Sequence, residues 1–76
     1  MQSVVTIDGQ DYVVRRESGP FDSFVGVGVQ IEHEGKIRRH AVKMQYEAGK
    51  SDEECVKAAK PLLDEWTKIV REGDAA

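Results

Sequence analysis

The chain has 76 residues, of which 33% are charged and 39% hydrophobic, and its formal net charge is −3. This length predicts a single domain, residues 1–76, near the size at which one hydrophobic core is marginally sufficient. No apolar run approaches the roughly 18 residues of a membrane span, and the sequence does not open with a basic region followed by an apolar block. We therefore expect a cytoplasmic protein without a membrane partner.

The charge is segregated along the chain. Residues 36–50 carry five Lys or Arg against one Glu, whereas the segments before and after are acidic. A basic strand between acidic segments indicates either charge compensation across strands or a basic binding stripe. Both interpretations stay open at this point.

The first predicted element is a β-hairpin around Asp8-Gly9, because this dipeptide lies between two β-prone runs and is typical of a two-residue turn. Counting outward from the turn places Ile7 opposite Gln10. Residues 17–22 follow, and they contain Gly19-Pro20. Proline removes a donor from a sheet ladder, so we expect a loop that connects to the next strand.

A second and longer hairpin is predicted around Glu34-Gly35, with His33 opposite Lys36. Alternation along its first strand places four large apolar residues on one face. The opposite face carries a mixture of small, polar and charged side chains, so we expect only one face of this hairpin to be buried.

A helix is predicted from Asp52 to about Glu72. Ser51 and Glu54 have the spacing of a capping box, in which each side chain satisfies a backbone donor of the first turn. The apolar residues that follow recur on one stripe at 100° per residue, which is typical of a helix that lies on a sheet.

Pro61 falls within this predicted helix, on the side away from the apolar stripe. Proline deletes one helical hydrogen bond and clashes with the preceding turn, so we expect a kink near Pro61 on the solvent face. The alternative is a break at Lys60 with Pro61 as the first residue of a second helix.

These elements predict an α+β domain in which a four-stranded antiparallel β-meander of two hairpins carries one C-terminal helix across one face. The predicted core contains ten strand residues and seven helix residues. The strand residues are Val5, Ile7, Tyr12, Val14, Val25, Val27, Val29, Ile31, Val42 and Met44. The helix residues are Cys55, Ala59, Leu62, Leu63, Trp66, Ile69 and Val70.

No residue pattern favours catalysis. Cys55 lies on the apolar helix stripe, where a free thiol is typical of a packed core residue. His33 adjoins a turn and His40 is expected to be half-buried under the helix edge, so the two do not share a metal site. The sequence predicts no enzyme, cofactor or metal.

From Gly19 to Trp66 the order β-β-α, with GPF entering the sheet and SDEECVKAAKPLLDEW as the closing helix, resembles the double-stranded RNA-binding domain. That family uses two basic residues at the start of its final helix to hold phosphates, and Asp52 and Glu53 occupy those positions here. The N-terminal helix of the family is replaced by the first hairpin. The segment GKSDEEC is similar to the helix start of HicB-type antitoxins. We assign the chain to no family.

Our functional hypothesis is a small interaction module that binds a protein, either a partner or a second copy of itself, through the sheet face that the helix leaves uncovered. Small acidic proteins of this kind include phage or mobile-element inhibitors of host machinery, such as anti-CRISPR proteins. The expected site surrounds a patch without large side chains. Its residues are Arg15, Phe24, Gly26, Gly28, Gln30, Arg39 and Lys43.

The alternative hypotheses are a HicB-like antitoxin and a nucleic-acid-binding module that uses the basic fourth strand. An acidic total charge and the lack of stacking aromatics on that strand count against nucleic acid. The residues of this alternative site are Arg15, Lys36, Arg38, Arg39 and Lys43.

Overall fold

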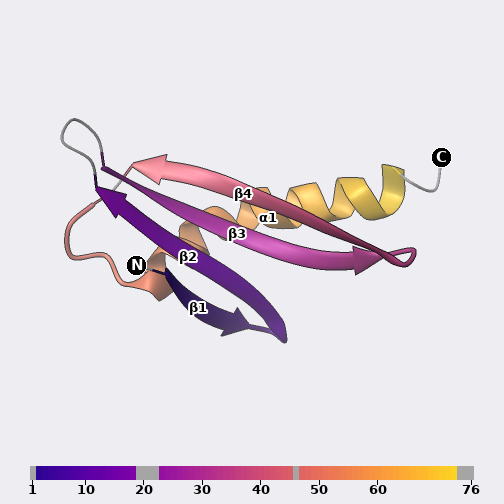
Figure 1. Ribbon diagram of the computed structural model, residues 1–76, viewed down its shortest axis with the longest axis horizontal. Coiled ribbons are helices and arrows are strands. Elements are labelled where there is room, and N and C mark those ends of the chain that lie inside the picture. The colour runs from indigo at the N-terminus through magenta and orange to yellow at the C-terminus, as the bar shows by residue number, and fades with distance from the viewer. Residues whose placement is uncertain (1, 19–22, 46, 74–76) are drawn as a thin grey trace.

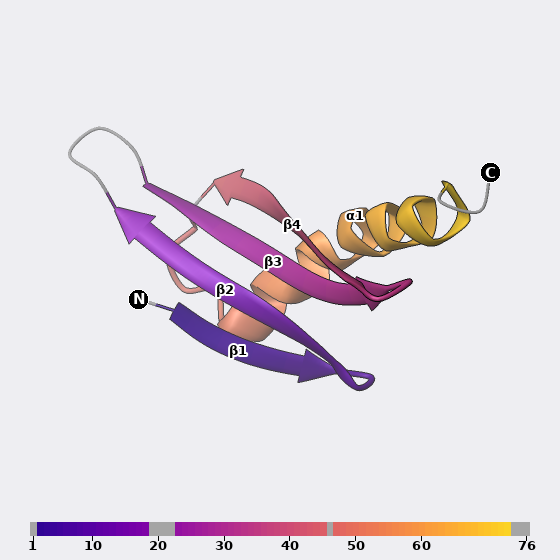
Figure 2. The same cartoon turned by 45° about the vertical axis from the view of Figure 1, so that its right-hand side comes forward.

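The computed structural model describes residues 2–18, 23–45 and 47–73. Its four strands form one antiparallel sheet in chain order, and a single helix follows and lies across one face of that sheet (Figures 1 and 2). The predicted α+β fold is therefore confirmed. The elements are β1 (Gln2–Ile7), β2 (Gln10–Ser18), β3 (Ser23–His33), β4 (Lys36–Gln45) and α1 (Asp52–Gly73).

Two tight turns set the register of the sheet. Both residues of Asp8-Gly9 have positive φ, 52° and 78°, and both residues of Glu34-Gly35 do so as well, 53° and 76°. This is the backbone of a type I′ turn, whose twist matches that of the flanking strands. The predicted pairings of Ile7 with Gln10 and of His33 with Lys36 are confirmed.

The connection between the two hairpins is shorter than predicted. β2 continues through Ser18, which pairs with Ser23 of β3. Glu17 was predicted to lie in the loop, but it pairs with Phe24 and belongs to the strand. The rest of the predicted loop, including Gly19-Pro20, lies outside the described residues.

The core lies between β3 and the first half of α1. Alternate residues of β3 point toward the helix and are at most 5% exposed. Half-buried side chains of β1, β4 and the later part of α1 surround this centre. The buried residues are Tyr12, Val14, Val25, Val27, Val29, Ile31, Cys55, Val56, Ala59 and Leu63, and those packed against them are Val5, Ile7, Val42, Met44, Trp66 and Val70.

The predicted helix contribution to the core was wrong at three positions. Leu62 and Ile69 were expected inside, but they are 59% and 58% exposed. Val56 was left out of the predicted core, yet it is fully buried. The apolar stripe is wider than the strip of helix that touches the sheet, so its two large edge residues stay in solvent.

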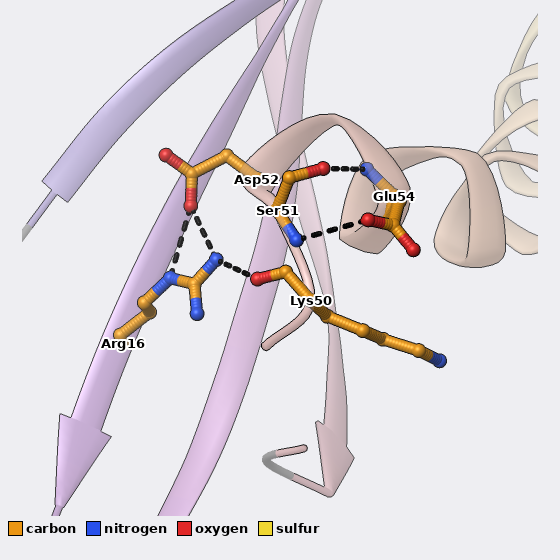
Figure 3. A network of polar contacts seen from close by, with 5 residues as sticks. All are labelled: Arg16, Lys50, Ser51, Asp52 and Glu54. Carbon is orange, nitrogen blue, oxygen red and sulfur yellow. Dashed lines mark hydrogen bonds and ion pairs between the residues drawn. The ribbon is translucent and has the colours of Figure 1, made fainter. Parts of the chain in front are cut away.

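The start of α1 is tied to the sheet by a polar network (Figure 3). The predicted capping box is confirmed, since the Glu54 amide donates to the Ser51 hydroxyl at 3.1 Å and the Ser51 amide donates to the Glu54 carboxylate at 3.3 Å. Arg16 of β2 donates to Asp52 from Nε at 2.9 Å and from Nη2 at 2.6 Å. The same Nη2 reaches the Lys50 carbonyl at 2.9 Å. One guanidinium thus fixes where the helix begins above the sheet.

α1 runs through Pro61 without interruption. The alternative of a second helix beginning at this residue is therefore wrong. Pro61 is exposed, as predicted, so its missing hydrogen bond faces water. The bend that proline introduces stays a prediction.

Adjacent leucines test which side of α1 is buried. Leu63→Ala should lower the free energy of unfolding by about 3 kcal/mol, because Leu63 is fully buried and its truncation leaves a cavity. Leu62→Ala removes the same atoms from an exposed site and should change stability by less than about 0.5 kcal/mol. Urea unfolding of both variants measures the difference, and equal losses would contradict the observed helix face.

The Arg16–Asp52 contact predicts a pH dependence of stability. Hydrogen bonds from Arg16 and then from Ser3 hold the pKa of the Asp52 carboxyl below its ordinary value. A lowered folded-state pKa contributes stability that is complete above the unfolded pKa and is lost as pH falls through the folded one.

Arg16→Ala should therefore cost about 1 kcal/mol at neutral pH, a modest value because both side chains are partly exposed. The cost should shrink below about pH 4, where Asp52 is protonated in the unfolded chain. Arg15→Ala is the matched control on the same strand. A cost of Arg16→Ala that is unchanged at low pH would show that the ion pair is not its source.

Candidate functional site

The sheet face opposite α1, here called the open face, brings together all seven residues predicted for the partner site. The register places Arg15, Gly26 and Lys43 side by side on β2, β3 and β4. In the next row Gly28 lies between Val13 and Ala41. Gln30 pairs with Arg39, and Phe24 lies at the other end of the face. For six of the seven residues the grouping follows from the confirmed register of the second hairpin, and Arg15 joins them through its pairing with Gly26.

The centre of the open face is a shallow hollow. Its lining is largely small or apolar, with the cationic side chains around it. The residues that line it are Gln2, Val13, Arg15, Phe24, Gly26, Gly28, Gln30, Arg39, Ala41 and Lys43, and it is also bordered by Val29, His40 and Val42, which belong to the helix-facing row of the register.

The glycines of the hollow are not required by the backbone. A Cβ at Gly28 would lie 3.5 Å from the His40 carbonyl oxygen and 3.7 Å from the Ala41 Cβ, which are ordinary contacts. A Cβ at Gly26 would have only the Arg15 carbonyl oxygen nearby, at 3.9 Å. The hollow therefore exists because side chains are missing, and the fold has room for them.

Each cation around the hollow is held by a neighbour. Arg15 pairs with Glu17 at 2.6 Å. Arg39 donates from Nε to the Gln30 side-chain oxygen at 2.8 Å. The Lys43 ammonium lies 4.2 Å from the centre of the Phe24 ring, a cation–π contact.

The partners of Arg39 and Lys43 decide between the two interpretations of the basic strand. In the part of the chain that the structure describes, neither cation forms an ion pair with a carboxylate. Their partners are an amide and an aromatic ring, which orient the charge without neutralising it. At these two positions charge compensation is not observed, and the strand can present positive charge to a ligand.

Two large apolar side chains lie exposed near opposite margins of the open face. Val4 of the edge strand β1 is 60% exposed, and Ile37 of the edge strand β4 is 62% exposed. Ile37 was not among the predicted site residues. The alternation of the second hairpin, which puts Ile37 in the outward row opposite Glu32, was the signal for it.

The residues considered for catalysis or metal binding lie apart from the open face. Cys55 is 4% exposed, which confirms its place in the core. His40 is exposed, so the prediction of a half-buried histidine was wrong; β4 is an edge strand, and one ring face rests on Trp66, with 5.1 Å between ring centroids. Across residues 2–18, 23–45 and 47–73, no group of three or more His, Cys, Asp or Glu is placed to hold a metal ion.

The remaining pKa shifts lie around Asp64 of α1. Burial of the Tyr12 hydroxyl, followed by the charge of Asp64, raises the pKa of that tyrosine. Its hydroxyl donates to the Asp64 carboxylate at 3.5 Å. A hydrogen bond to Asp64 raises the pKa of Lys60. The Tyr12–Asp64 contact joins α1 to β2, whereas the Lys60–Asp64 contact lies within the helix, and both are on the side of the sheet opposite the candidate site.

Comparisons with family models, curated proteins and solved structures give no match to this chain. Among the described residues, no helix combines the length and apolar character that crossing a bilayer requires.

The open space at Gly28 predicts a gain of stability. Gly28→Ala should raise the free energy of unfolding by about 0.5–1 kcal/mol, because glycine in a strand interior loses more conformational freedom on folding than alanine. Gly35→Ala is the opposite control, since its φ of 76° disfavours a side chain and should make that variant less stable. Urea unfolding midpoints measure both. A Gly28→Ala protein less stable than the parent would mean that the hollow is a requirement of the fold.

Proposed function

We propose that this chain is a non-enzymatic interaction module that binds a partner protein on the open face. The observation that carries the proposal is the hollow at Gly26 and Gly28, which the fold does not require. Glycine costs strand stability, so a site that retains it gains room for close approach by another chain. The exposed apolar side chains near the margins and the oriented cations around the hollow supply the mixed surface that is typical of protein interfaces.

A different protein fits this face better than a second copy does. A two-fold symmetric contact apposes the same patch on both subunits. Centred on the hollow, it would bring Arg39 and Lys43 of one copy, which have no carboxylate partner among the described residues, toward the same two cations of the other. Like charges opposed in an interface disfavour that arrangement, so the partner we propose presents acidic groups around an apolar contact.

Nucleic acid is the competing ligand for the same cations. Single-stranded binding sites combine a positive groove with aromatic rings on which bases stack. On the described part of the open face the one aromatic ring is Phe24, and Lys43 already lies over it. A base would have to displace this cation before it could stack on that side of the ring.

The proposal is tested by filling the hollow. The tagged chain captures its partner from an extract of the source cell, and Gly28→Arg should abolish that capture while the thermal transition is retained. Gly73→Arg is the matched control, because it adds the same side chain at the end of α1, where a Cβ meets nothing within 4 Å. A Gly28→Arg protein that captures the same partner as efficiently as the control would contradict the proposed site.

A second measurement separates the two ligand classes. Fluorescence anisotropy with a labelled duplex and a labelled single strand should show no binding near physiological salt. If the cations instead hold phosphates, the logarithm of the affinity should fall with the logarithm of the salt concentration. Each phosphate contact on the duplex should add about −0.9 to that slope. Tight, salt-sensitive binding that Arg39→Glu with Lys43→Glu removes would overturn the protein-binding proposal.

A further inference from the structure

β4 is an edge strand with unused backbone groups. In the described sheet its only neighbour is β3. The two-residue turn makes His33–Lys36 a hydrogen-bonded pair, and such pairs recur at every second residue of an antiparallel ladder. The backbone N–H and C=O groups of Ile37, Arg39 and Ala41 therefore point away from β3, where a fifth strand would lie.

Two exposed aliphatic side chains of α1, with the half-buried Trp66 between them, lie above that same place. Leu62, Trp66 and Ile69 are spaced i, i+4 and i+7, so they form one continuous strip along α1. Trp66 stacks on His40 of β4, whereas Asp64, on the other flank of the helix, meets Tyr12 of β2. The strip therefore faces the β4 side, and the end of α1 extends beyond β4 in both views of the ribbon (Figures 1 and 2).

The apolar side chains beneath the helix are also less buried on β4 than on β3. The core residues of β3 are at most 5% exposed, but Val42 and Met44 of β4 are only half-buried. On the helix, Leu62 and Ile69 are 59% and 58% exposed. We call these four residues the apolar ledge; on β4 the helix-facing row continues past Val42 into His40, which stacks on Trp66. An added strand, about 4.8 Å from β4, would lie on this ledge.

The charge of β4 selects the strand that can fill the position. Lys36, Arg38, Arg39 and Lys43 belong to β4, and Asp and Glu are absent from it. Lysine and arginine on an edge strand discourage indiscriminate pairing, and they oppose a second copy of β4, because it would bring four more cations to the same edge. They attract an acidic strand for the same reason.

We infer that β4 and the Leu62–Trp66–Ile69 strip form a docking site for an extended acidic segment of another protein, which joins the sheet as a fifth strand. The backbone N–H and C=O groups of this segment form hydrogen bonds with the outward groups of β4. Its apolar side chains pack under the helix strip, and its carboxylates lie beside Arg39 and Lys43. Strand addition of this kind takes affinity from the main chain and specificity from alternate side chains. This site shares Arg39 and Lys43 with the hollow, but it adds the backbone edge of β4 and the helix strip, which the hollow does not include. Leu62→Gln with Ile69→Gln therefore tests it separately from Gly28→Arg.

A synthetic peptide tests the site without any cellular partner. The probe is an eight-residue peptide that alternates glutamate with valine, and its control alternates lysine with valine. Trp66 is the one tryptophan of the chain, so its fluorescence reports docking beside it. The acidic peptide should bind saturably, change that fluorescence and slow hydrogen exchange at the Arg39 and Ala41 amides, while the basic peptide does none of these.

Two variants locate the contact. Leu62→Gln with Ile69→Gln should weaken binding about tenfold or more, because the buried area of two aliphatic side chains is lost. Lys57→Gln with Lys68→Gln, on the opposite side of α1, is the matched control and should leave affinity within about twofold. Ala41→Pro deletes one outward donor without removing a bond to β3, and should abolish binding in a chain that stays folded.

The inference is overturned if the wild-type chain does not bind the acidic peptide, or if the basic peptide binds as well. It is also overturned if binding ignores the helix variant, or if the slowed amides belong to β1. Protection of the Arg39 and Ala41 amides that rises with protein concentration, without peptide, would place a second copy at this edge and overturn it as well.

Discussion

The packing of β3 against the first half of α1 is the constraint on which the rest of the molecule depends. Val27 and Leu63 are fully buried at its centre. Because side chains alternate along a strand, the register that buries the valines of β3 also places Gly26 and Gly28 on the open face. A slip of one residue would exchange the two sets. Core and candidate site are therefore two results of the same register.

The parts of the structure that local sequence determines were predictable. The dipeptides Asp8-Gly9 and Glu34-Gly35 specify turns with both residues at positive φ, and each turn sets the pairing of a whole hairpin. The start of α1 follows from the spacing of Ser51 and Glu54. Once the second hairpin was in register, six of the seven site residues shared one face. Arg15 joins them through the pairing of β2 with β3, which neither turn sets.

The direction in which α1 crosses the sheet was not predictable, because helix periodicity defines an apolar stripe but not which part of it makes contact. This is why Leu62 and Ile69 were assigned to the core and why Val56 was missed. The contact of Arg16 with Asp52 joins residues 36 positions apart and has no local signal either. The exposure of His40 follows from the same cause, since it depends on where the helix leaves the sheet edge.

The two faces of the sheet differ in composition and in their contribution to stability. One face carries the ten strand residues that form the core of the domain with α1. The other bears two glycines that cost strand stability, cations held by an amide and a ring, and apolar side chains near its margins. The edge beside α1 adds unused backbone groups and two exposed aliphatic side chains. The surface that does not stabilise the fold is thus the one available for a partner.

The most direct test of this account is paramagnetic broadening of methyl signals by a soluble nitroxide in the free chain. The account predicts strong broadening for Val4 and Ile37, intermediate broadening for Val13, and none for Val25, Val27 and Val29. Protection of Val13, Val4 and Ile37 would mean that the open face is already covered. Broadening of the β3 valines would mean that the helix does not pack on this side, and either result would contradict the account.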